Sequence, residues 1–136
     1  MIELQHIHKT FNSGKANEVK ALKDISLTIR EKEFVVIVGS NGSGKTTLLN
    51  LMAGAEFCSQ GKILIAHNDV TTLPEYKRSK WIARVFQNPL SGTAPDLSII
   101  DNFRLASLRT QAKKLSIGVD TVFKNKVKEK IALLQM

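Results

Sequence analysis

One loop constrains the fold of this chain more than any other stretch. It reads Gly39-Ser40-Asn41-Gly42-Ser43-Gly44-Lys45-Thr46-Thr47, follows the apolar run Phe34 to Val38, and leads into leucines spaced for a helix. A strand, then G-x-x-x-x-G-K-[ST], then a helix is the context in which this motif binds phosphate. The glycines let the backbone bend so that several N–H groups point into one concavity. That concavity and the helix N-terminus both favour an anion.

Two side chains of the loop add chemistry to this backbone. Lys45 would supply positive charge to the β- and γ-phosphates of a nucleotide, and the Thr46 hydroxyl is placed to ligate Mg²⁺. The alternative is an ordinary glycine-rich turn between a strand and a helix. Because the glycines, the lysine and the threonine all fall at the required offsets, the pattern favours phosphate binding.

Composition bounds the class of protein. The chain has 136 residues, which is typical of one domain. Its single cysteine, Cys58, cannot form an internal disulfide and is expected to be a small core residue in a reducing compartment. The sequence begins without a secretory signal pattern, and no run approaches the roughly 18 apolar residues of a membrane span. We therefore expect a cytoplasmic protein that reaches a membrane only through a partner.

The net charge of +8 at pH 7 would suit nucleic acid or anionic lipid. Much of the excess lies late in the chain, where lysines recur between residues 113 and 130. Such a run is typical of a solvated helix face. Phe123 is the single aromatic residue among these lysines, so we do not expect a platform for single-stranded nucleic acid.

Periodicity predicts two half-buried strands before the loop, at residues 1–11 and 19–30. The alternation of the first strand breaks near His6, which predicts a β-bulge. His6 and His8 could ligate a metal, but no third ligand is visible, and we expect exposed strand residues instead. Phe34 to Val38 is apolar on both faces, as in a strand buried inside a parallel sheet. After these, the sequence predicts strands at residues 61–66 and 81–86. It predicts helices at residues 45–54, 96–110 and 122–135, and a short polar and basic helix at residues 75–80.

Three features stand in the order and spacing of a known family. They are Lys9-Thr10-Phe11 followed by Ala21 to Leu27, the loop from Gly39 to Thr47, and Val85-Phe86-Gln87. With them the chain resembles the N-terminal half of the nucleotide-binding subunit of ATP-binding cassette (ABC) transporters. The resemblance implies an incomplete α/β fold of the P-loop NTPase class. That fold has an N-terminal antiparallel β-layer, a partial parallel core sheet and the start of a helical subdomain.

The resemblance also implies a division of the chain and a set of site residues. Residues 1–88 would form the ATP-binding core with the A-loop, Walker A and Q-loop motifs, and residues 89–136 the start of the helical subdomain, ending before the signature motif. Phe11, where the family more often has Tyr, would stack on adenine, and backbone N–H groups from about Gly42 to Thr47 would hold the phosphates. Thr46 and Gln87 would complete the shell of Mg²⁺ with waters. The implied cofactors are therefore ATP and Mg²⁺.

The implied partners are a transmembrane permease subunit, bound through the helical subdomain, and a second nucleotide-binding subunit in a dimer. The protein would then lie at the cytoplasmic face of the cell membrane. The stretch from Gln87 to Pro95 resembles a bacterial subgroup found beside periplasmic substrate-binding proteins, which favours import over export.

Several groups that the family needs for ATP hydrolysis are not found in this sequence. No apolar run of four residues is followed by Asp-Glu, and the Leu-Ser-Gly-Gly-Gln signature is missing. Leu90-Ser91-Gly92-Thr93 lies too close to Gln87 to serve as that signature, and Asp101 is expected to be a helix residue. No catalytic set is complete, although Lys45 and Gln87 belong to one. We expect this chain alone to bind nucleotide weakly at best and not to hydrolyse ATP.

Three other functions stay open at the level of sequence. A soluble cassette protein acting on ribosomes or nucleic acid would suit the positive charge. A small-molecule kinase or GTPase is less compatible with the β-layer before residue 39 and with the lack of a visible Asn-Lys-x-Asp motif. A non-enzymatic remnant of a truncated gene would explain the missing motifs.

Overall fold

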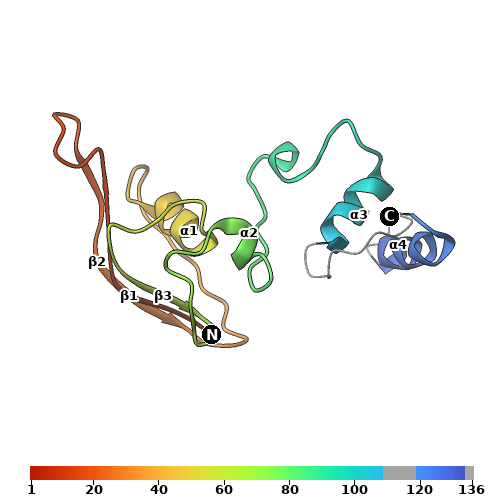
Figure 1. Cartoon of the computed structure of the whole chain (residues 1–136), viewed down its shortest axis with the longest axis horizontal. Coiled ribbons are helices and arrows are strands. Elements are labelled where there is room, and N and C mark those ends of the chain that lie inside the picture. The colour runs from red at the N-terminus through yellow and green to blue at the C-terminus, as the bar shows by residue number, and fades with distance from the viewer. Residues whose placement is uncertain (109–118, 134–136) are drawn as a thin grey trace. The chain divides into compact units, whose positions relative to one another are not determined.

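The computed structural model describes residues 1–108 and 119–133. The chain divides into two compact units, residues 1–82 and 83–136 (Figure 1). The first unit contains β1 (Ile2–Phe11), β2 (Val19–Ile29), α1 (Lys45–Ala53), β3 (Gln60–Ile65), β4 (Asn68–Asp69) and α2 (Glu75–Arg78). The second contains a 3-10 helix (Pro89–Gly92), α3 (Ile99–Leu108) and α4 (Thr121–Leu133). No helix in these described ranges has the length and apolar character needed to cross a bilayer.

The strands form one antiparallel sheet in the order β2-β1-β3-β4. The central strand β1 places Leu4 opposite Leu27 of β2 on one side and opposite Ile63 of β3 on the other. Alternation of apolar and polar residues predicts β1 and β2 correctly, because each strand buries only one face. The antiparallel β-layer expected from the sequence is confirmed.

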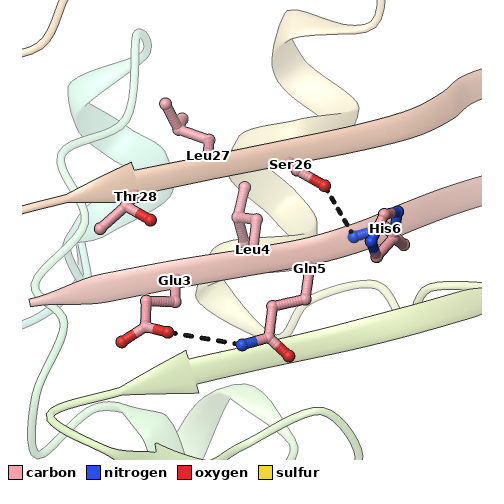
Figure 2. Close-up of a pocket in the computed structure, with 7 residues that line it drawn as sticks. All are labelled: Glu3, Leu4, Gln5, His6, Ser26, Leu27 and Thr28. Carbon is pink, nitrogen blue, oxygen red and sulfur yellow. Dashed lines mark hydrogen bonds between the residues drawn. The ribbon is translucent and has the colours of Figure 1, made fainter.

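A bulge interrupts β1 at His6, as the broken alternation predicts. The register against β2 shifts between Leu4 and Ile7, and the register against β3 shifts between Gln5 and His8. His6 has a φ of 49°, and its backbone N–H donates to Ser26 Oγ at 3.0 Å (Figure 2). The extra residue lets Ile7 return to the buried face of the sheet, where it is 0% exposed.

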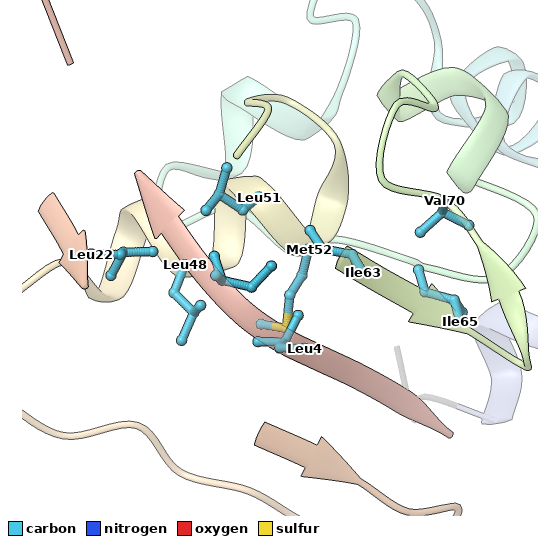
Figure 3. Close-up of a cluster of buried hydrophobic side chains, with 9 residues drawn as sticks. Leu4, Leu22, Leu48, Leu51, Met52, Ile63, Ile65 and Val70 are labelled. Carbon is cyan, nitrogen blue, oxygen red and sulfur yellow. The ribbon is translucent and has the colours of Figure 1, made fainter. Parts of the chain in front are cut away.

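The core lies between this sheet and one face of α1. Leu48, Leu51 and Met52 stand at the i, i+3, i+4 spacing of a helix face, and Leu49 on another face is 49% exposed. Figure 3 shows Leu48 and Met52 of α1 directed toward Leu22 and Leu4 of the strands. The buried cluster comprises Leu4, Ile7, Leu22, Leu48, Leu51, Met52, Ile63, Ile65 and Val70. Cys58 and Trp81 are partly buried against this cluster.

The strands predicted at residues 34–38 and 81–86 are not formed. No described segment pairs with either run, so the partial parallel core sheet is also not formed. Phe34, Val36 and Val38 are 91%, 65% and 85% exposed, and Val85 is 95% exposed. An apolar pattern shows a tendency to be buried, but a strand requires a neighbour that takes up its N–H and C=O groups. The prediction was wrong because the pattern cannot show whether that neighbour is present.

Arg78, which sequence reasoning assigned only to a short basic helix, is fully buried at 0% exposure. Its Nη1 donates to the carbonyl oxygens of Leu51 at 2.6 Å and Met52 at 3.1 Å. Its Nε donates to Leu73 O at 2.7 Å and its Nη2 to Thr71 O at 3.1 Å. Burial lowers the pKa of Arg78, but a guanidinium stays protonated in proteins. Arg78 therefore places a positive charge at the C-terminus of α1, where the helix dipole is negative.

We predict that Arg78→Met lowers the free energy of unfolding by about 3 kcal/mol, because it leaves two buried and two partly buried carbonyl oxygens without their donor. Urea unfolding measures this difference. Lys77→Met removes an exposed positive charge from the same helix and is expected to change stability by less than about 0.5 kcal/mol. Equal losses in the two variants would contradict the capping role of Arg78.

Gly44 fixes the other end of α1 against the sheet. It precedes the helix with a φ of 88°. A Cβ at this position would lie 2.8 Å from both the carbonyl oxygen of Ala21 and Cδ2 of Leu22. Both the backbone conformation and the close approach to β2 therefore require glycine.

A comparison of two alanine substitutions separates these requirements. Gly42→Ala introduces a side chain at a φ of 80° with no atom within 4 Å, and we expect a loss of about 1–2 kcal/mol from backbone strain. Gly44→Ala adds a clash with β2 and should cost about 3 kcal/mol or more. Thermal unfolding of both variants provides the test, and equal losses would show that contact with β2 does not constrain this position.

Candidate phosphate-binding site

The predicted loop connects the unpaired run at residues 34–38 to α1. Its bend uses the positive φ of Gly42 and Gly44, and Ser43 N donates to Ser40 O at 3.2 Å. Packing of Leu48, Leu51 and Met52 fixes α1, so the C-terminal half of the loop is held by the core. The loop and the helix expected from the sequence are therefore formed as predicted.

Lys45 folds back over the loop. Its ammonium donates to Gly39 O at 2.9 Å and to Ser40 O at 2.7 Å, and it lies 3.4 Å from Ser43 Oγ. These contacts hold a positive charge over the backbone that precedes the helix. An anion arriving in the loop would meet this charge directly.

The N-terminus of α1 has no internal partner for its first donors. No side chain caps the helix, and its first turn contains no acidic residue. The N–H groups in the first turn of a helix lack intrahelical acceptors and bind anions with the help of the helix dipole. Together with Lys45, these uncapped donors suit the charge and the acceptor oxygens of a phosphate chain.

The residues also suit Mg²⁺ carried in with that phosphate chain. Thr46 is exposed at the start of α1, so its hydroxyl is accessible to an ion. Among the residues that the structure describes, no group of three or more His, Cys, Asp or Glu side chains is arranged to hold a metal. Mg²⁺ commonly takes one or two protein ligands and completes its shell with phosphate oxygens and waters. A single hydroxyl beside a phosphate loop fits that requirement.

Phe11 ends β1 on the same part of the sheet that contacts the loop. Lys9 of β1 pairs with Leu22 of β2, and Leu22 in turn contacts Gly44. Phe11 lies two residues further along β1, which is about 7 Å along the strand. The half-buried ring has the ammonium of Lys9 at 4.6 Å from its centroid. The register thus places Phe11 at the end of the strand pair whose Leu22 lies against the loop.

Gln87 belongs to the second unit. It is an exposed residue in a bend directly before the 3-10 helix, whose start Asn88 caps by accepting from Leu90 N at 3.0 Å. The loop and Phe11 lie in the first unit. The role of Gln87 beside Thr46 stays a prediction.

A hollow of about 430 Å³ lies over β1 and β2 at the bulge (Figure 2). Its lining residues are Glu3, Leu4, Gln5, His6, Ser26, Leu27 and Thr28. They include a carboxylate and no lysine or arginine, so the hollow does not suit a phosphate. His6 Nδ1 lies 2.7 Å from Asp24 Oδ1, and both side chains are exposed. His6 is thus exposed as predicted, whereas His8 is half-buried.

Sequence reasoning missed Lys9 as a neighbour of the candidate site. A signal was available, because residues i and i+2 of a strand project from the same face and Lys9 precedes Phe11 by two positions. The other contacts of Lys9, with Glu56 and Phe57, join residues far apart in the chain and carry no local signal.

The sequence matches the ABC transporter family over residues 22–135. It is 38% identical over 106 residues to the tyrosine transport ATP-binding protein of Clostridioides difficile, covering 78% of this chain and 42% of that protein. It is 41% identical over 91 residues to the methionine import ATP-binding protein MetN 2 of Enterococcus faecalis, covering 65% of this chain and 26% of that protein. The chain therefore spans less than half the length of these relatives.

Solved structures agree with this match. The dimeric ATP-binding cassette MJ0796, in a post-hydrolysis state bound to ADP and Pi, superposes with a TM-score of 0.80 and is 26% identical. The superposition covers 100% of this chain and 58% of that one. The fold is thus that of ABC ATPase cassettes. With the loop geometry and the antiparallel layer, the match over residues 22–135 shows that this chain belongs to the ABC transporter family.

Proposed function

We propose that this chain is an ATP-binding part of an ABC transporter, in which ATP binding and hydrolysis drive transport across a membrane. The geometry of the loop from Gly39 to Thr47 carries this proposal. It combines an ammonium over the loop backbone with an uncapped helix N-terminus. Both features favour a polyphosphate over an uncharged ligand.

ATP with Mg²⁺ supplies a phosphoanhydride bond whose hydrolysis releases free energy. In the proposed site, backbone N–H groups from Gly42 to Thr47 bind the phosphates, and Lys45 gives up contacts with loop carbonyls to pair with phosphate oxygens. Thr46 and Gln87 are the proposed ligands of Mg²⁺, and Phe11 stacks on the adenine. The exposure of Thr46 supports its role, and the pairing of Lys9 with Leu22, which lies against Gly44, supports that of Phe11 at the end of the same strand.

We assign residues 1–88 to the ATP-binding core and residues 89–136 to the start of a helical subdomain that contacts a permease subunit. The second unit offers a largely apolar hollow of about 300 Å³ beside the N-terminus of α3. It is lined by Thr93, Ala94, Pro95, Leu97, Ile99, Asn102 and Phe103. Such a hollow suits an apolar side chain of a partner.

Import is the proposed direction of transport, because relatives include proteins named for methionine import and spermidine/putrescine import. A second nucleotide-binding subunit is a further proposed partner, supported by the dimeric state of the similar cassette. The protein would then work at the cytoplasmic face of the membrane.

Calorimetric titration with Mg-ATP tests the proposed site. Lys45→Ala removes the ammonium from the loop, and we expect it to weaken ATP binding by about tenfold or more. Lys15→Ala removes an exposed charge from the loop between β1 and β2 and is expected to leave affinity unchanged within about twofold. Equal affinities of all three proteins for ATP would contradict the assignment of the loop.

We further propose that the 136-residue chain binds ATP without turning it over. Its sequence contains neither the acidic pair nor the signature motif that the resemblance associates with hydrolysis. Purified protein incubated with Mg-ATP should release phosphate no faster than the Lys45→Ala variant. Sustained phosphate release that depends on Lys45 would contradict this proposal.

A further inference from the structure

The ammonium of Lys9 makes three different contacts at the end of β1. It lies 2.8 Å from Glu56 Oε2 and 2.8 Å from the carbonyl oxygen of Phe57, both in the segment after α1. It also lies 4.6 Å from the centroid of the Phe11 ring. The Lys9 side chain is only 12% exposed. A carboxylate, a carbonyl and an aromatic face thus take up a charge that would be costly to bury alone.

Neighbouring backbone contacts keep this arrangement in place. Ser59 N donates to His8 O at 2.8 Å, and Thr10 N donates to Ser59 Oγ at 3.0 Å. The residues on both sides of Lys9 are therefore tied to the same segment that carries Glu56 and Phe57. The ammonium of Lys9 is therefore fixed in its location next to the Phe11 ring, both by its own hydrogen bonds and by those of the backbone on either side of it.

We propose that Lys9 is a positioning residue for the base of the bound nucleotide. This inference rests on the proposed function, in which Phe11 stacks on that base. Because Lys9 occupies one face of the ring, a base can stack only on the opposite face. A cation on one face also draws π-electron density toward itself, which makes the opposite face a better partner for an electron-rich purine.

The role of Lys9 predicts a difference between two ligands. Inorganic tripolyphosphate engages the loop but has no base, whereas ATP engages both the loop and Phe11. Loss of a positive charge near the site weakens both ligands through long-range electrostatics. Loss of ring positioning weakens ATP alone, so the ratio of the two affinities isolates the effect on the base.

The experiment titrates the full chain with each ligand in the presence of Mg²⁺, using calorimetry or NMR. Lys9→Met keeps a similar volume and removes the charge, and the preference for ATP over tripolyphosphate should fall by about 3- to 10-fold. Lys9→Arg retains a cation over the ring and should keep most of the preference. Phe11→Ala marks the complete loss of the base contribution. Lys62→Met removes a charge from β3 of the same sheet and should leave the ratio unchanged.

Unchanged ratios in Lys9→Met, or equal weakening of both ligands, would overturn the role of Lys9. Should Lys9→Met fail to fold, Lys9→Arg decides the question, since loss of the ATP preference in a folded arginine variant also contradicts the proposal. Failure of the wild-type chain to bind either ligand would instead refute the proposed function itself. Binding of both ligands with equal affinity by the wild type would refute base stacking while leaving the phosphate site intact.

Discussion

The hydrogen bonds of Arg78 to the last carbonyls of α1 are the constraint on which the candidate site depends. A helix of nine residues is too short to be stable alone, so its location must come from tertiary contacts. Arg78 connects the C-terminus of α1 to the segment between β4 and α2 through hydrogen bonds. Gly44 allows the N-terminus of α1 to approach β2 closely. Leu48, Leu51 and Met52 fix its rotation about its own axis by packing on the sheet. The first turn of α1 therefore has a defined location and direction before any ligand arrives.

The same arrangement sets the electrostatics of the loop. Arg78 neutralises the negative end of the helix dipole inside the protein, while the positive end stays uncapped beside Lys45. An acidic residue in the first turn would partly cancel that positive field, and α1 has none. A side-chain cap would likewise occupy the donors that a phosphate needs. The N-terminus of α1, where the candidate ligand binds, thus lacks a stabilising side-chain cap. The buried guanidinium of Arg78 stabilises the C-terminus of the same helix.

Residues whose environment is set by local pattern were predictable, and residues whose environment is set by distant segments were not. The strands β1 and β2, the bulge at His6 and the loop before α1 follow from alternation and glycine placement. Phe34 to Val38 is an equally clear strand pattern, a continuous apolar run. No strand forms there, because a parallel strand depends on a neighbour elsewhere in the chain. Arg78 belongs to a polar, basic stretch, and only the three-dimensional convergence of carbonyl oxygens reveals that it is buried. Lys9 lies between these cases, since its spacing to Phe11 is local while Glu56 and Phe57 are far away in sequence.

The two sides of the phosphate loop are held unequally, and this has a consequence for affinity. On the C-terminal side, Gly44 and α1 are packed into the core. On the N-terminal side, residues 33–40 have no strand pairing in the described structure, and within the run 34–38 only Ile37 packs against the core. Gly39 and Ser40, whose carbonyl oxygens accept from Lys45, belong to this less constrained side. A phosphate chain must order that backbone when it binds, and the entropy of ordering reduces the net binding free energy. We therefore expect weak nucleotide binding by this chain because of how the loop is supported, although its donors and its charge are suited to phosphate.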